Sequence, residues 1–127
     1  MTIKHSDTPE YKVACCDLRI TVDCDKDYKP VRVRIQPNKE GGCIANQDGL
    51  CHVVTALLEC GKITEAEEAL RGIKCGACIS KKAKLKNKGR DDEAKEYCDS
   101  CAAAVHKALK DVPVRLKERD EKKEEKK

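Results

Sequence analysis

The sequence predicts an α+β domain in which an N-terminal antiparallel β-hairpin packs on two or three helices. Two patterns support this class: apolar residues alternate in two segments near the N-terminus, and later segments carry apolar residues at helical spacing. A third observation concerns size, because the 127 residues include ten Cys, three Tyr and no Phe or Trp. Such a chain has a small apolar core, which usually needs a metal or disulfides to stabilise it.

The hairpin is predicted from two runs in which every second residue is apolar. The runs consist of Leu18, Ile20 and Val22, followed by Val31, Val33 and Ile35. A period of two is typical of strands with one buried face, and the residues of Asp25–Pro30 between the runs favour a turn. We therefore expect a hairpin over about residues 13–36.

The first predicted helix extends from about Asp48 to Cys60, with Gly61 as its C′ residue. Its apolar positions follow one another at helical intervals. We expect the face that they form to pack on the hairpin. This face consists of Leu50, Val53, Val54, Leu57 and Leu58.

Two further helices are predicted. The second begins near Thr64, which has Glu67 three residues later as in a capping box, and one apolar face continues to Ile73. The third runs from Asp91 or Asp92 to about Leu109, because acidic residues favour a helix N-terminus. Pro113 is expected to end it.

The predicted domain organisation has three parts. Residues 1–11 form an N-terminal extension, residues 12–112 form the folded domain, and residues 113–127 form a charged tail. From Arg115 to Lys127 the tail contains Leu116 as its only large apolar side chain, so we expect it to be disordered.

Two Cys-x-x-Cys pairs carry the strongest chemical signal. Cys75 and Cys78 are followed, after 19 residues, by Cys98 and Cys101, a spacing typical of structural zinc sites. Four thiolates around Zn²⁺ leave no open position, so the metal would be structural. Buried free cysteines, a Cys-x-x-Cys redox pair and a disulfide scaffold are the alternatives. The predicted fold is therefore α+β with a cysteine-rich zinc site.

Six cysteines remain, and all but Cys15 divide into two groups. Cys24, Cys51 and Cys60 continue apolar faces and are expected to be small core residues. Cys16 and Cys43 lie at the edges of predicted elements, where a turn can direct a thiol towards a shared metal.

The segment from Ser80 to Arg90 is predicted to be a solvated loop, because it has six basic residues, no acidic residue and the turn formers Asn87 and Gly89. The basic side chains can meet the phosphates of a nucleotide or of nucleic acid such as DNA. The alternative is a loop that only increases solubility. The six residues are Lys81, Lys82, Lys84, Lys86, Lys88 and Arg90.

The sequence contains no recognisable catalytic pattern. His52 and His106 are expected on helix surfaces, and no HExxH, P-loop or GxGxxG pattern occurs. Residues 1–7 lack the apolar stretch of a signal peptide, and no window has the roughly 18 apolar residues of a membrane span. We therefore expect a cytoplasmic protein without membrane contact and without independent catalysis.

The order of several short motifs resembles the TSCPD domain. These are the strand segment Leu18–Val22, Gly41-Gly42-Cys43, Gly72-Ile73-Lys74-Cys75 and Ser100-Cys101. In the motif that names the family, only Ser100 and Cys101 match. The resemblance covers roughly residues 13–109 and implies a second possible zinc quartet, formed by Cys16, Cys43, Cys75 and Cys101.

The resemblance also implies a function. TSCPD domains occur near the C-terminus of adenosylcobalamin-dependent (class II) ribonucleotide reductases and as small stand-alone proteins. It therefore implies an accessory zinc-binding domain that assists a ribonucleotide reductase subunit in deoxyribonucleotide synthesis, or that binds nucleotide. A zinc-knuckle protein that binds nucleic acid and a thiol redox protein are the alternatives from other classes.

Overall fold

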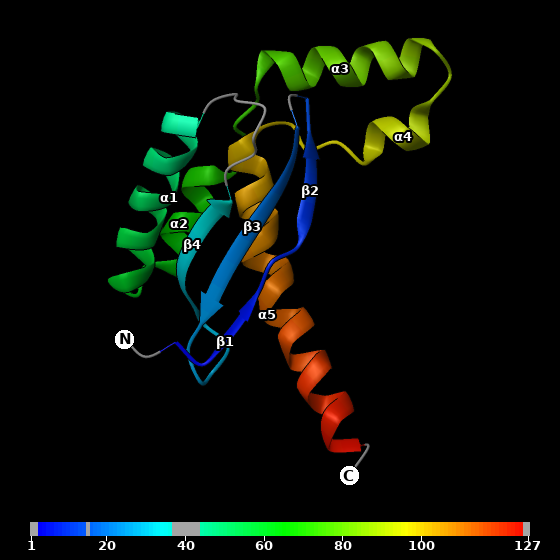
Figure 1. Cartoon of the computed structure of the whole chain (residues 1–127). Coiled ribbons are helices and arrows are strands. Elements are labelled where there is room, and N and C mark those ends of the chain that lie inside the picture. The colour runs from blue at the N-terminus through cyan, green and yellow to red at the C-terminus, as the bar shows by residue number, and fades with distance from the viewer. Residues whose placement is uncertain (1–2, 15, 37–43, 126–127) are drawn as a thin grey trace.

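The computed structural model describes residues 3–14, 16–36 and 44–125 of the chain, in which four strands are followed by five helices (Figure 1). The strands are β1 (His5–Asp7), β2 (Glu10–Val13), β3 (Cys16–Cys24) and β4 (Pro30–Gln36). The helices are α1 (Ile44–Glu59), α2 (Ile63–Leu70), α3 (Gly76–Asn87), α4 (Asp91–Lys95) and α5 (Cys101–Glu125). The predicted α+β class is confirmed.

β3 is the central strand of the sheet. β4 pairs antiparallel with one edge of β3, which confirms the predicted hairpin. In the turn between them, the Asp25 carboxylate accepts hydrogen bonds from the backbone N–H groups of Asp27 and Lys29, and Tyr28 adopts a φ of 62°. An aspartate that bonds to the backbone two residues on is a common way to close such a turn.

The other edge of β3 is covered by β1 and β2, which keep a single register. Asp7 lies opposite Val22, and Glu10 lies opposite Arg19. The two strands therefore act as one strand interrupted around Pro9. The predicted extension over residues 1–11 missed them, because Pro9 breaks the pattern and Tyr11 is the first large apolar residue that enters the core.

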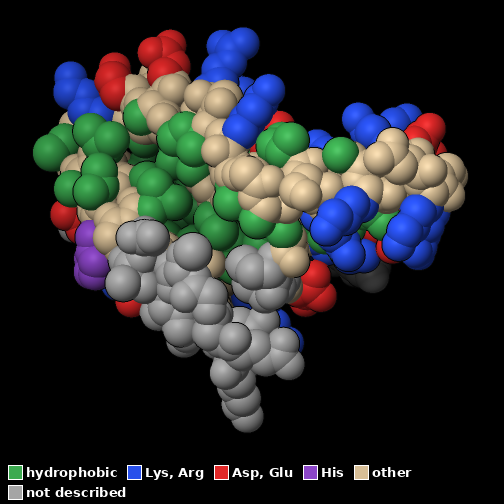
Figure 2. All heavy atoms as spheres, turned by 90° about the horizontal axis from the view of Figure 1, so that it is seen from above, with side chains coloured by type: hydrophobic (Ala, Val, Ile, Leu, Met, Phe, Trp, Pro, Cys, Tyr) green, Lys and Arg blue, Asp and Glu red, His purple; other side chains and the backbone are tan. Residues whose placement is uncertain are grey.

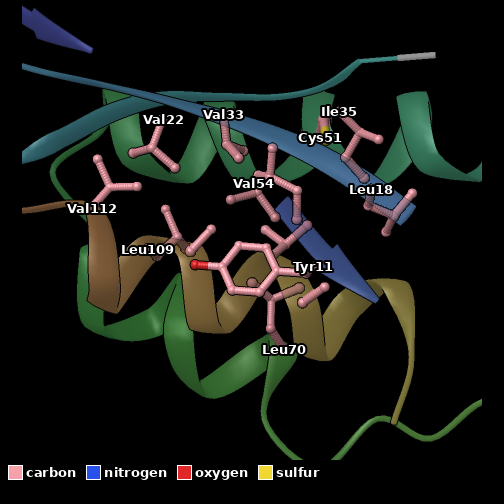
Figure 3. Packing of buried hydrophobic residues seen from close by; sticks show 14 of the residues in the cluster. Tyr11, Leu18, Val22, Val33, Ile35, Cys51, Val54, Leu70, Leu109 and Val112 are labelled. Carbon is pink, nitrogen blue, oxygen red and sulfur yellow. The ribbon is translucent and has the colours of Figure 1, made fainter. Parts of the chain in front are cut away.

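The core lies between the sheet and the helices. Figure 3 shows Val22 and Val33 of the sheet facing Leu109 and Val112 of α5, with Tyr11 beside Leu109. All but Tyr11 are at most 1% exposed. Alternate residues of β3 point to this side, as the sequence predicted.

Helix α1 covers the free edge of β4 with polar groups. The Thr55 hydroxyl accepts a hydrogen bond from the N–H of Val33 and donates one to its C=O, both at 3.2 Å. The N–H of Ile35 donates to the Cys51 thiol. These contacts satisfy edge groups that would otherwise be open to pairing with another strand.

The same contacts explain a correction to the predicted face of α1. Cys51, Val54 and Leu58 are buried, but Val53 is 63% exposed and Leu57 is only partly buried. Compared with the prediction, α1 is rotated about its axis so that Cys51 and Thr55 meet β4. This rotation turns Val53 to the surface.

Gly61 is confirmed as the C′ residue of α1, with a φ of 74°. Its N–H donates to the C=O of Leu58, and the N–H of Lys62 donates to the C=O of Leu57, as in a Schellman motif. The chain passes directly into α2 at Ile63, with Lys62 as an N-cap that makes no side-chain hydrogen bond. The predicted capping box of Thr64 and Glu67 is therefore wrong, because Thr64 already lies inside the helix.

The end of α2 differs from the prediction as well. Ile73 was expected to continue its apolar face, but the helix ends at Leu70 and Ile73 is 43% exposed. Gly72, with a φ of 77°, turns the chain away before Ile73 is reached.

The predicted loop over Ser80–Arg90 is wrong, because most of it belongs to α3. Lys, Ala and Leu favour helices, and Cys78 and Leu85 lie seven residues apart on one buried face. A Schellman motif around Gly89 ends the helix and leads to α4. Together α3 and α4 form an arm that projects from the sheet (Figure 1).

The third predicted helix is divided, and it does not stop at Pro113. It begins with α4, is interrupted by residues 96–100, and continues as α5 to Glu125. Beyond Pro113, Leu116 is fully buried, so the disordered tail predicted from residue 113 is a helix up to Glu125. The Pro ring removes one backbone hydrogen bond, but this cost is offset by tertiary contacts.

Those contacts link the end of α5 to the N-terminal half of the chain. Asp120 accepts a hydrogen bond of 2.7 Å from the Tyr28 hydroxyl and lies 3.6 Å from His5. Arg115 forms an ion pair of 3.1 Å with Asp7. The partners are about 100 residues apart in the sequence, so no local pattern indicates them.

Candidate cysteine site

Cys75 and Cys78 lie together at the beginning of α3. Cys75 is the N-cap residue, and its side chain makes no capping hydrogen bond. The nearby backbone N–H groups of Cys78 and Ala77, together with the Cys78 thiol, lower the pKa of the exposed Cys75 thiol. Burial instead raises the pKa of Cys78, although the N–H of Ala14 donates to its sulfur at 3.4 Å.

Cys101, the first residue of α5, lies near this pair. Its charge is close enough to raise the pKa of the Cys78 thiol, and that of the Cys51 thiol on α1. The Gln47 amide of α1 donates a hydrogen bond of 3.4 Å to the Cys101 sulfur. The N-termini of α3 and α5 therefore lie close to α1 and to Ala14, which follows β2. We call this part of the domain, which contains Cys75, Cys78 and Cys101, the cysteine corner.

Cys98, the first cysteine of the second pair, lies apart from the cysteine corner. Its backbone N–H donates to the C=O of Lys12 at 2.8 Å, next to a single bridge between Lys12 and Tyr97. Burial raises the pKa of the Cys98 thiol, against the opposing effect of the nearby Lys107 ammonium. Cys98 lines a hollow with Lys107, and among the described residues no side-chain hydrogen bond joins it to the cysteine corner.

Ser100 explains why the second pair is divided. Its hydroxyl accepts a hydrogen bond of 2.9 Å from the N–H of Ala103 and donates one of 2.7 Å to the C=O of Ile73. It thus caps α5 and ties the start of this helix to the chain before α3. Cys98 precedes the cap in an extended segment, whereas Cys101 follows it in the helix.

The structure brings together part of each predicted quartet. Cys75, Cys78 and Cys101 gather at the cysteine corner, and Cys98 does not join them. In residues 3–14, 16–36 and 44–125, no group of three or more His, Cys, Asp or Glu side chains is arranged to hold a metal. The predicted ligand Cys43 lies outside the described residues. The backbone of Cys16 begins β3, next to the residues that contact Cys78.

The other cysteines and histidines behave largely as predicted. Cys24 and Cys51 are buried, and burial raises their pKa to about 12 and about 11. Cys60 was expected in the core but is exposed, because α1 ends at Glu59. His52 is exposed, as predicted for a residue on a helix surface.

The predicted basic residues fall on two sides of α3. Lys82 and Lys86, one helical turn apart, line a hollow between α3 and α4, whereas Lys81, Lys84 and Lys88 do not. Arg90 forms an ion pair with Glu93. Figure 2 shows basic side chains on both flanks of the arm. The sequence analysis missed Lys95 and Lys110, which line the hollows beside α3 and carry no motif of their own.

The order of the motifs on this scaffold agrees with a comparison against known families. The sequence model of the TSCPD domain matches residues 1–113, most of the chain. The chain belongs to the TSCPD domain family. No curated protein and no solved structure matches it. TSCPD domains are linked to class II ribonucleotide reductases, and in the described part of this one no helix is long and apolar enough to cross a membrane.

Proposed function

We propose that this TSCPD domain is an accessory protein of ribonucleotide reduction whose cysteine corner binds one structural Zn²⁺. The observation that supports the proposal is the pair Cys75 and Cys78 at the N-terminus of α3, with Cys101 at the start of α5 near enough for its charge to raise the pKa of Cys78. Thiolates are ligands that Zn²⁺ favours, and positive helix ends stabilise them. The fourth ligand is Cys16 or Cys43, the two cysteines that the family resemblance adds.

Metal binding suits the rest of the corner. The backbone N–H of Ala14 donates to the Cys78 sulfur and the Gln47 amide donates to the Cys101 sulfur, as the outer partners of metal-bound thiolates commonly do. A closed thiolate site leaves no position for substrate, so the metal joins α3, α5 and the sheet and performs no chemistry.

The partner is the catalytic subunit of a class II reductase. The family link supports this assignment. The direct test is sedimentation of the full chain with such a subunit that lacks a TSCPD domain. A stable complex supports the role, and two independently sedimenting species would remove it.

Zinc content tests the metal part separately. Protein purified without chelators should contain about one zinc per chain, because a closed site of this kind binds tightly. The metal would be measured by mass spectrometry together with a count of free thiols. A metal-free chain with all ten thiols reactive would contradict the proposal.

One observation favours a second candidate, a thiol redox protein. Cys75 is exposed with a lowered pKa, and it accepts a hydrogen bond from the buried Cys78, as in many Cys-x-x-Cys redox sites. In that case both thiols lose a proton and an electron to form a disulfide, while a disulfide of the partner is reduced to two thiols. A metal-free chain that loses two thiols reversibly with mild oxidant would support this function.

A further inference from the structure

We propose that a groove beneath the arm binds a nucleoside polyphosphate, with the phosphates between α3 and α4 and the nucleoside beside α5. The groove consists of two adjoining hollows, which share Lys82 and Lys95 as lining residues. Their volumes are about 410 Å³ and about 380 Å³. Each lies within the size range of small-molecule sites.

The two hollows differ in chemistry. The hollow between α3 and α4 is lined by charged residues alone, three Lys against the single acid Asp91. The hollow beside α5 has a less polar wall that includes Tyr97, Cys98 and Ala103. A ligand that fits both has a polyanionic part and a flat, partly apolar part. A nucleoside polyphosphate has this division.

Three of the four acidic side chains that line the groove have a partner. Asp99 forms an ion pair of 2.7 Å with Lys82, and Glu96 forms one of 3.1 Å with Lys12. Asp111 accepts a hydrogen bond of 2.9 Å from the buried Tyr11 hydroxyl. Glu96 is thus paired with a lysine outside the groove, whereas Asp99 neutralises Lys82, and the lining keeps a small positive excess of five Lys against four acids.

Several ammonium groups of the groove, in contrast, are available. Lys86, Lys95 and Lys110 make no side-chain hydrogen bond or ion pair with the residues that the structure describes. A phosphate chain can accept hydrogen bonds from these groups, and charge-assisted bonds of this kind are stronger than neutral ones. Tyr97, which is half-buried, lines the hollow beside α5, where its ring can stack on a base.

The lysines of α3 supply a matched control. Lys81, Lys84 and Lys88 belong to the same helix or its C-cap, but they line neither hollow. A diffuse attraction of polyanions would use both sets of lysines equally. A built site in the groove depends only on the set that lines it. The proposal is independent of the proposed zinc site, since the groove contains none of its ligands.

The test is calorimetric titration of the full chain at about 50 mM salt, where phosphate contacts are strong. The probes are ATP, inorganic tripolyphosphate and a ten-nucleotide oligo-dT. The groove variant Lys86→Gln/Lys95→Gln/Lys110→Gln and the control Lys81→Gln/Lys84→Gln/Lys88→Gln each remove three charges. Because all six side chains are exposed, the fold should persist in both, which circular dichroism checks.

We expect the wild type to bind ATP more tightly than tripolyphosphate. The groove variant should lose about tenfold or more in ATP affinity, and the control less than about twofold. Tyr97→Leu should weaken ATP but not tripolyphosphate. Equal losses in both triple variants, or oligo-dT binding as tight as ATP, would reveal a diffuse polyanion surface and overturn the proposal. Absence of ATP binding at millimolar concentration would overturn it too.

Discussion

The two Cys-x-x-Cys pairs have the same spacing but different structures. Both thiols of Cys75 and Cys78 lie at the beginning of α3 and are joined by a hydrogen bond. Cys98 and Cys101 are separated by the cap of α5, so that one thiol faces the groove under the arm and the other faces the cysteine corner. Identical spacing therefore gives one intact pair and one divided pair.

The difference arises from the place of each pair relative to a helix start. A pair that begins at the N-cap has its second cysteine in the first turn, where the chain curves back on the first. A pair that ends just after the cap has its first cysteine in the extended segment. Ser100, which lies between Cys98 and Cys101 and forms the cap, decides this second outcome.

The largest effect that distinguishes the two Cys-x-x-Cys pairs is expected in the zinc content. Cys101→Ser should reduce zinc from about one per chain to nearly none, because it removes one of four thiolates from the proposed site. Cys98→Ser should keep the full content, since Cys98 belongs to the groove. Both variants would be expressed identically and measured by mass spectrometry.

Cys75→Ser is the matching control for the first pair, and it should lose zinc as Cys101→Ser does. Loss of zinc from Cys98→Ser to the same extent would show that the second pair closes around the metal as an intact pair. The quartet of Cys75, Cys78, Cys98 and Cys101 would then hold the ion.

The next test concerns the helix that carries Cys101. If α5 is folded beyond Pro113, Leu116→Ala should lower the free energy of unfolding by about 2–5 kcal/mol, because Leu116 is fully buried. Val114 lies two residues away and is 55% exposed, so Val114→Ala should cost less than about 0.5 kcal/mol. Urea unfolding of both variants measures the difference. Similar values for the two would mean that the helix is frayed past the proline.

Leu116 also shows what the sequence can and cannot predict. The hairpin, the first helix with its Gly61 cap, and the burial of Cys24 and Cys51 follow from local periodicity and turn chemistry. The continuation of α5 depends on Tyr28, Asp7 and His5, which lie far away in the sequence. Local propensity at Pro113 points the other way, and only tertiary contacts reverse it.

The same limit applies to the candidate site. The spacing identifies Cys75 and Cys78 as a close pair, because one helical turn contains both. It does not reveal that Ser100 holds the start of α5 in place, since the Ser100 hydroxyl donates a hydrogen bond to the C=O of Ile73, a residue 27 positions earlier. The sequence indicated only Lys82 and Lys86 of the groove. Lys95 and Lys110 join them through the packing of α3, α4 and α5, which no local pattern shows.

Thiol reactivity gives a smaller, kinetic contrast between the two pairs. In the reduced, metal-free protein, Cys75 should react with iodoacetamide about tenfold faster than Cys98 at pH 7. The backbone N–H groups of α3 lower the pKa of Cys75, whereas burial raises that of Cys98. The rate for Cys75 should therefore reach its plateau at lower pH, as peptide mapping over a pH series would detect. Equal rates and midpoints would indicate that both pairs lie in similar surroundings.

The smallest expected effect tests the cap that divides the second pair. Ser100→Ala should lower the free energy of unfolding by about 1–2 kcal/mol, because it removes the N-cap bond to Ala103 and leaves the C=O of Ile73 without its donor. Ser80→Ala, inside α3 and exposed, is the control and should change stability by less than about 0.5 kcal/mol. Ser100→Thr should retain most of the stability, since Thr also caps helices. If Ser100→Ala is as stable as the control, the hydroxyl does not hold the start of α5, and Cys98 and Cys101 are kept apart by the path of the backbone alone.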